Sequence, residues 1–233
     1  MPSVRPKGLS LAAALLACLP AAVLAGYDKP PEPLLGVMHA PLPATPVLDP
    51  TRQRMLLVEQ SQYPPIARVA EPYLKLAGLR IEPANHARHD ASSGYGIRTC
   101  LKSFTVEEVA SHKQLPVTLP ADACPSAPQW SPDGRRFAFA NTTKERTELW
   151  LGDALTGQVR RVEGVWLNPV MEDDVQWLHG SDSLLVKQVP ANLGAAPKVS
   201  ETSGPEIKES IGGKGESSTY EARDTLGSPE DEA

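Results

Sequence analysis

Two histidines and an aspartate lie close together in the sequence as His86, His89 and Asp90. Imidazole nitrogens and carboxylate oxygens are good zinc ligands, so this cluster is the first candidate for chemistry. No clear further ligand accompanies it, and we interpret the stretch as a polar loop. The acidic run 172–174 lacks the spacing of a calcium-binding loop and is interpreted as an exposed strand entry. We therefore predict no metal site and no cofactor.

A serine nucleophile for acyl transfer usually lies in a Gly-x-Ser-x-Gly turn that exposes the hydroxyl beside an oxyanion hole. The sequence has no such motif, and the nearest match is GLSLA at residues 8–12. No alternation of helix and strand patterns follows that would build a hydrolase sheet. We assign no catalytic residue to these 233 residues.

The stretch QWSPDGRRFAFA at 129–140 predicts a compact hairpin. Pro132 and the Asp133-Gly134 pair suit a type I turn, and Phe137 and Phe139 alternate with small residues as in a strand. Two more short strands follow in ELWLGDALTGQVRRVEG at 148–164. Four short strands with tight turns are typical of one propeller blade.

This unit recurs weakly along the chain. Trp130 and Trp177 lie 47 residues apart, which is close to the length of one four-stranded blade. Upstream, Asp49-Pro50 aligns with Ser131-Pro132 at an offset of 82, which requires an insertion of about 35 residues that we place at 63–96. Within it, apolar residues from Ile66 to Ala77 have helical spacing, although Pro72 limits any helix to short pieces.

The first 25 residues have the pattern of a secretory signal peptide. Arg5 and Lys7 precede an apolar run that ends in small residues, which predicts cleavage after Ala25 and export to the periplasm or the medium. A lipoprotein signal with Cys18 as the lipidated residue is the alternative. A membrane anchor is a third reading, but the run is interrupted by Pro20 and is short for spanning a bilayer.

Composition excludes several classes of protein. Removing the signal takes away two positive charges and no negative ones, so the formal net charge falls from −5 to −7. No basic stripe remains, and we expect no nucleic-acid partner. The 24 prolines argue against a helical bundle, because proline breaks helix interiors. The four tryptophans are interpreted as strand core rather than as a stacking platform.

The two cysteines outside the signal, Cys100 and Cys124, form an even pair in an exported chain. They either form a disulfide or are two separate small buried residues. Residues 26–46 read as an extended, proline-rich lead-in, and residues 47–197 as the strand region. Residues 198–233 are polar, and alone they would be disordered.

Several stretches together resemble the glutamyl endopeptidase branch of the prolyl oligopeptidase family. The resemblance rests on the proline-rich lead-in, LAGLRIEP at 76–83, Asn85 with Arg88, and the stretches WSPDGRRFAF, LWLGDALTGQVRRV and LLVKQVP. The resemblance covers nearly the whole chain after the signal. It implies an N-terminal β-propeller followed by a C-terminal α/β-hydrolase domain with a Ser-Asp-His triad.

On that resemblance, the fold is all-β: about three four-stranded antiparallel blades of a partial β-propeller, preceded by a signal peptide. The chain is then a fragment of a secreted serine-type peptidase. Its partners are the hydrolase domain and peptide substrates, and it is inactive alone, with no membrane contact after signal removal. Arg80, Asn85 and Arg88 in the insertion are candidates for the interdomain or substrate-access surface, and the alternative is a structural loop that packs on the propeller. The alternative is a stand-alone periplasmic binding or scaffold module.

Overall fold

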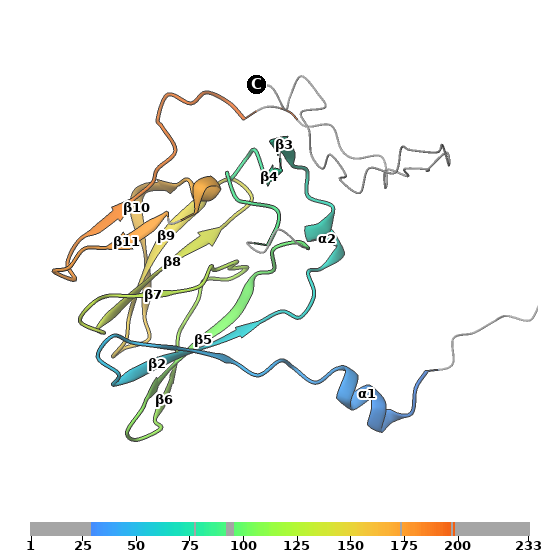
Figure 1. The fold of residues 1–233 in the computed structure, drawn as a ribbon, viewed down its shortest axis with the longest axis vertical. Coiled ribbons are helices and arrows are strands. Elements are labelled where there is room, and N and C mark those ends of the chain that lie inside the picture. Colours follow the sequence, from blue (N-terminus) through green and yellow to red (C-terminus); the bar gives the residue numbers. More distant parts are fainter. Residues whose placement is uncertain (1–28, 77, 92–95, 173, 197, 199–233) are drawn as a thin grey trace, which may run out of the picture. The chain divides into compact units, whose positions relative to one another are not determined.

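The computed structural model describes residues 29–76, 78–91, 96–172, 174–196 and 198. The described residues divide into two units, one that ends at Ala40 and one that begins at Pro41. In the first unit, α1 (Glu32–Met38) is a helix without a buried residue (Figure 1). The lead-in expected to be extended therefore contains a helix. Pro33 permits this, because an N–H in the first turn has no intrahelical partner to lose.

Two predicted segments lie outside the described residues: the signal peptide at 1–25 and residues 199–233 of the polar tail. In the part of the chain that is described, no helix is both long enough and apolar enough to cross a bilayer.

The first four-stranded sheet of the second unit is antiparallel, with strand order β1-β2-β5-β6. Asp49 shapes the turn between its first two strands, because its carboxylate accepts hydrogen bonds from the Gln53 backbone N–H at 2.9 Å and the Thr51 hydroxyl at 2.8 Å. The strands are β1 (Thr45–Leu48), β2 (Arg54–Gln60), β5 (Leu101–Glu108) and β6 (Gln114–Pro116).

The second sheet is also antiparallel and four-stranded, in the order β10-β9-β8-β7. Its strands are β7 (Gln129–Trp130), β8 (Arg136–Thr142), β9 (Thr147–Asp153) and β10 (Val159–Leu167). The Ser-Pro-Asp-Gly turn joins the first two, as its residues predict. The Gly134 N–H donates to the Ser131 carbonyl at 2.9 Å, and its φ of 67° is a conformation that favours glycine.

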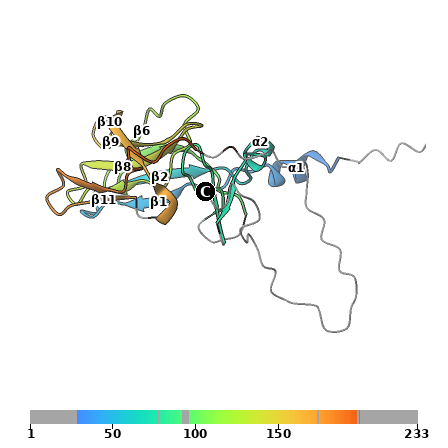
Figure 2. The ribbon, with the colours of Figure 1, turned by 90° about the horizontal axis from the view of Figure 1, so that it is seen from above.

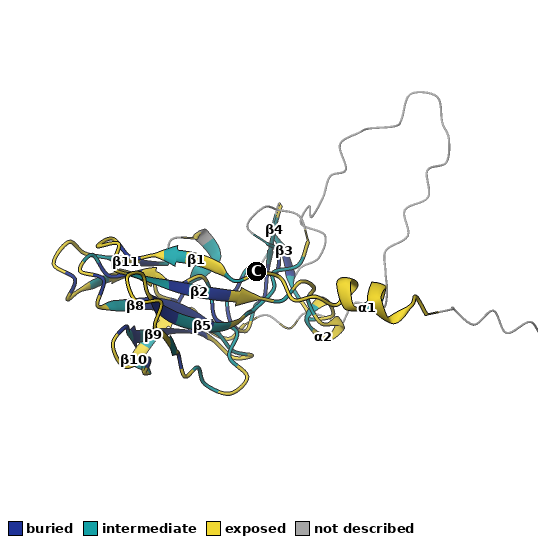
Figure 3. Cartoon of the chain, turned by 90° about the horizontal axis from the view of Figure 1, so that it is seen from below, coloured by how far each residue is buried: buried dark blue, intermediate teal, exposed yellow. Residues whose placement is uncertain are grey.

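Strand β8 is buried on both faces. Phe137 and Phe139 pack in one apolar cluster with the first sheet, whereas Ala138 and Ala140 pack in a second cluster on the opposite face. The ring of Phe104 in β5 meets the ring of Phe139 edge to face, with centroids 5.4 Å apart. Figure 3 shows the resulting burial of β2 and β8. The period-two pattern of aromatic and small residues thus places β8 between neighbouring sheets.

The ring of Phe137 lies against Gly152, its pairing partner in β9. A Cβ atom at Gly152 would lie 2.1 Å from Cζ of Phe137. Glycine is therefore required in β9 by the close approach of the ring.

A third, two-stranded sheet consists of β11 (Val175–Trp177) and β12 (Leu184–Val186). Its apolar side chains join the second cluster, and the Trp177 indole N–H donates to the Gln129 carbonyl at 3.0 Å. The predicted all-β, antiparallel character is confirmed. Of the three expected four-stranded blades, the described residues contain two four-stranded sheets and this hairpin. They contain no closed ring of sheets, and the propeller stays a prediction.

Residues 61–100 connect β2 to β5 and are called the insertion from here on. They contain α2 (Ile66–Val69), β3 (Leu74–Leu76) and β4 (Leu79–Ile81). Both Figure 1 and Figure 2 show these elements at one end of the two larger sheets. The helical spacing predicted from Ile66 to Ala77 yields only one turn, because Pro72 prevents its continuation and the next residues pair as strands.

Candidate functional site

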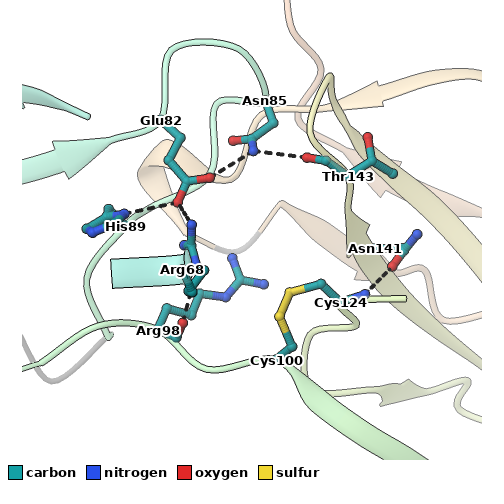
Figure 4. The surroundings of a disulfide bond; sticks show 9 residues. All are labelled: Arg68, Glu82, Asn85, His89, Arg98, Cys100, Cys124, Asn141 and Thr143. Atoms are coloured by element: carbon teal, nitrogen blue, oxygen red, sulfur yellow. Dashed lines mark hydrogen bonds and ion pairs between the residues drawn. A yellow bond between two sulfur atoms is a disulfide. The ribbon is translucent and has the colours of Figure 1, made fainter. Parts of the chain in front are cut away.

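The insertion encloses a group of polar side chains that we call the insertion cluster: Arg68, Glu82, Asn85, His89 and Arg98 (Figure 4). Glu82 is at its centre. Its Oε1 forms an ion pair with Arg68 and lies 3.2 Å from Nδ1 of His89, and its Oε2 accepts a hydrogen bond from Asn85 at 2.8 Å. Glu82, Asn85 and His89 are buried. Arg68 also donates to the carbonyl of Arg98 at 3.5 Å.

Backbone hydrogen bonds position the two ends of the loop that follows β4. The Glu82 N–H donates to the Ala87 carbonyl at 2.9 Å, and the His89 N–H donates to the Arg80 carbonyl at 2.8 Å. The Asn85 side chain closes the turn between them by accepting from the Ala87 N–H at 2.8 Å. Asparagine is suited to this position, because its short side chain bonds to the backbone two residues on.

The Glu82 carboxyl is held in its ionised form. Burial alone would raise its pKa, because it removes water from the charged group. Hydrogen bonds from His89 and Asn85 and the charge of Arg68 outweigh that effect, so the pKa of Glu82 lies below its ordinary value. The carboxylate is an acceptor and a counter-charge at neutral pH, and it has no proton to give as a general acid.

Asn85 connects the insertion to the second sheet. Its side-chain amide donates to the backbone carbonyl of Thr143 at 3.0 Å, and its backbone carbonyl accepts from the Thr147 hydroxyl at 2.9 Å. Thr143 lies in the turn between β8 and β9, and Thr147 begins β9. The structure therefore gives this candidate residue a buried, positioning role.

The other two candidate residues also have partners within the chain. Arg80 lies 3.5 Å from the carboxylate of Asp90, and its guanidinium is 5.3 Å from the ring centroid of Tyr73. Arg88 forms an ion pair with Glu172, which precedes β11. These contacts hold the insertion to itself and to the third sheet. The role of the three candidates at an interdomain or substrate-access surface stays a prediction.

His86 and His89, the two histidines considered as zinc ligands, contact different aromatic rings. His86 meets Trp166 edge to face at a centroid distance of 5.6 Å, whereas His89 stacks on Tyr73 at 4.6 Å. Burial lowers the pKa of His86 below its ordinary value, so its ring is neutral at pH 7. Across the described residues, no three His, Cys, Asp or Glu side chains are grouped as metal ligands.

Cys100 and Cys124 form a disulfide with a Cα–Cα distance of 4.7 Å. It joins the end of the insertion to the segment that leads into the second sheet. The Cys124 N–H donates to the Asn141 side chain at 2.8 Å, and the Thr142 N–H donates to the Cys124 carbonyl at 3.1 Å. Closing a loop of this length stabilises a fold by roughly 3 kcal/mol in the chain-entropy model.

Within the insertion cluster, Asn85 positions the backbone of the loop after β4 and of the turn before β9. Among the described side chains, the histidine hydrogen bonds of His89 and His112 go to glutamates and not to a serine or cysteine nucleophile. Sequence analysis missed Arg68, Glu82 and Arg98 as members of one cluster. The available signal was LAGLRIEP at 76–83, in which Glu82 directly follows a short apolar strand.

Comparison with known proteins identifies relatives. A probable chloroplastic glutamyl endopeptidase of Oryza sativa subsp. japonica is 30% identical over 197 residues, which cover 78% of this chain and 20% of that protein. Its counterpart in Arabidopsis thaliana is 29% identical over 187 residues, covering 76% and 19%. The chain thus spans about a fifth of the length of the curated relatives it matches. No family model matches the chain.

Among solved structures, Pyrococcus horikoshii acylaminoacyl peptidase aligns with 63% of this chain and 17% of its own, at 14% identity and a TM-score of 0.35. A putative dipeptidyl aminopeptidase IV from Bacteroides ovatus aligns with 49% and 16%, at 14% identity and a TM-score of 0.30. These scores are too low to support an argument about the fold. By its sequence relatives, the chain belongs with the N-terminal part of the glutamyl endopeptidases of the prolyl oligopeptidase family.

Proposed function

We propose that this chain is the N-terminal propeller portion of an exported serine-type peptidase. The observation that carries the proposal is the similarity of 78% of the chain to a probable glutamyl endopeptidase about four times as long. The 233 residues contain no nucleophile elbow, and in the proposal peptide-bond hydrolysis belongs to an α/β-hydrolase domain encoded elsewhere in the parent protein.

The proposed role of the sheets is to restrict access to that catalytic domain. Stacked antiparallel sheets with a common apolar core make a rigid wall, and a ring of such sheets admits only narrow substrates. In this proposal the substrates are peptides or unfolded segments, and cleavage follows acidic residues as the names of the relatives suggest. The expected signal peptide and the disulfide are consistent with an oxidising, extracytoplasmic location.

The decisive experiment compares two products of the same gene in the original host. One is the 233-residue chain, and the other is the chain translated together with whatever reading frame follows it. We expect a fluorophosphonate probe to label only the longer product, and that product to hydrolyse glutamyl peptides faster than their glutamine counterparts. A mutation of the labelled serine serves as the control for contaminating proteases.

Two results would overturn the proposal. Peptide hydrolysis by the purified 233-residue chain would show that the catalytic residues lie in this chain and not in a separate hydrolase domain. A stop after codon 233 followed by an unrelated gene would instead favour a stand-alone binding or scaffold module. N-terminal sequencing of the secreted product tests the export step, and we expect it to begin at Gly26.

A further inference from the structure

A pocket of about 460 Å³ opens beside the disulfide. Cys100 lines it together with the charged residues Arg68, Glu71 and Lys102, and uncharged residues, both polar and apolar, complete the wall. Cys124 is not among the lining residues. The pocket therefore gives access to the disulfide from the side of Cys100.

In the lining of this pocket cations outnumber anions, although Arg68 is already paired with Glu82. Arg68 and Lys102 contribute two cations to the lining and Glu71 one anion. In Figure 4 the side chain of Arg98 also extends from the insertion toward the disulfide. A positive local potential attracts anions and favours a thiolate over a thiol. Because the thiolate is the species that attacks a disulfide, both effects favour exchange at this position.

The two cysteines differ in how their backbones are held. Cys124 is bound on both sides, since its N–H donates to Asn141 and its carbonyl accepts from the Thr142 N–H. These bonds hold Cys124 in place beside β8 when the disulfide opens. Cys100 lines the pocket and Cys124 does not, so we infer that an entering small molecule approaches the disulfide at Cys100.

We propose that this pocket is a thiol-exchange site for anionic low-molecular-weight thiols. The thiolate attacks Sγ of Cys100, the S–S bond breaks, and Sγ of Cys124 leaves with the electron pair and takes up a proton. A second thiolate then attacks the small-molecule sulfur of the mixed disulfide on Cys100. It releases the small disulfide and the Cys100 thiolate, which is protonated in turn. Two electrons and two protons pass from two thiols to the protein.

Opening this bond detaches the insertion from the segment that leads into the second sheet. Next to the disulfide, a backbone hydrogen bond from Leu101, the first residue of β5, to Pro125 remains, at 3.4 Å. We expect amides of residues 96–100 and of α2 to exchange faster after reduction. Amides in the middle of β8 and β9 lie within the apolar clusters and keep their protection.

The test uses the full chain and three small thiols of different charge. These are 2-mercaptoethanesulfonate, 2-mercaptoethanol and cysteamine, each supplied at the same thiolate concentration. At an ionic strength of about 0.01 M, we expect the anionic thiol to open the disulfide roughly threefold faster than the neutral one and the neutral one faster than cysteamine. In about 1 M salt the Debye length is ~3 Å and the three rates should converge.

A variant locates the charge effect. K102Q should reduce the advantage of the sulfonate on the order of threefold, whereas K113Q, a matched change outside this pocket, should leave it unchanged. If K102Q does not fold, the salt dependence of the unmodified chain provides the same test.

Mass spectrometry of the first intermediate decides between the two sulfurs. After brief reaction and trapping with iodoacetamide, we expect the sulfonate adduct on Cys100 and the alkyl group on Cys124. An adduct mainly on Cys124 would overturn the proposal, and so would equal rates for the sulfonate and cysteamine at low salt.

Discussion

The second sheet and the insertion are held together by different forces. In the second sheet, Phe137 and Phe139 are buried among apolar side chains contributed by both larger sheets. In the insertion, the buried centre is a glutamate surrounded by Arg68, Asn85 and His89. One region is stabilised by non-directional burial of apolar surface, and the other by directional contacts to a charge.

This difference has consequences for tolerance to change. An apolar core loses stability in proportion to the atoms removed, and it can partly collapse around a gap. A buried charge has no such adjustment, because removing one partner leaves the other without compensation. We therefore expect the sheets to respond to changes in volume and the insertion to respond to changes in charge.

The largest effect is expected from truncating the core aromatic of the second sheet. Phe137→Ala removes a fully buried ring that contacts Phe104 and Trp130 edge to face. It should lower the free energy of unfolding by about 4 kcal/mol in urea titrations followed by tryptophan fluorescence. Leu155→Ala, at a side chain that is 64% exposed, is the control and should change it by less than about 0.5 kcal/mol. Similar losses of unfolding free energy in the two variants would show that Phe137 contributes no more to stability than an exposed side chain.

The next largest effect is expected from neutralising the centre of the insertion cluster. Glu82→Gln keeps the volume but leaves Arg68 without its counter-charge, which costs about 3 kcal/mol locally. Hydrogen exchange should become faster in the insertion, while amides in β8 and β9 stay protected. Glu145→Gln, at an exposed glutamate, is the matched control. Equal loss of protection in both regions would show that they unfold as one unit.

Acid should weaken the insertion through the same carboxylate. Because the folded-state pKa of Glu82 lies below its ordinary value of 4.5, its stabilising contribution is fully present above that value. The contribution is lost as the pH falls through the lowered pKa. Hydrogen-exchange rates in the insertion, corrected for their intrinsic pH dependence, should therefore rise as the pH is lowered below 5. Glu82→Gln should abolish that rise, and an unchanged rise would assign it to another group.

The smallest effect is expected at the outer ion pair of the insertion. Arg88→Gln removes the contact with Glu172, whose side chain is 54% exposed. Such a pair contributes about 0–1 kcal/mol because water and salt screen it. The midpoint temperature of thermal unfolding should change little in this variant. Adding salt to the unmodified chain should lower that temperature by a similarly small amount. A loss as large as that of Glu82→Gln would mean that this contact acts as a buried one.

The sheets were largely predictable from the sequence. The Ser-Pro-Asp-Gly turn and the alternation of Phe137 and Phe139 correctly located β7 and β8, because turn chemistry and side-chain period are local properties. The 47-residue spacing also placed Trp130 and Trp177 at equivalent positions, each at the end of the first strand of a hairpin. Whether the sheets belong to a closed ring was not decided by such local signals.

The insertion cluster was much less predictable. Its members lie between residues 68 and 98, and nothing in their spacing shows that Arg68 meets Glu82 or that both are buried. The short helix α2 agrees with the limit that Pro72 sets on the helical spacing around Ile66, but that spacing did not predict the hairpin of β3 and β4 that follows. Long-range contacts between polar residues leave no periodic pattern in a single sequence.

The position of the insertion between β2 and β5 also affects the order of folding. These strands are neighbours in the first sheet, although 40 residues separate them along the chain. Every neighbouring pair in the second sheet is consecutive in sequence. Since closing a long loop costs entropy before any contact is gained, we expect the second sheet to form first and the first sheet to wait for the insertion. Pulse-labelled exchange during refolding should then detect protection in β8 and β9 earlier than in β2 and β5.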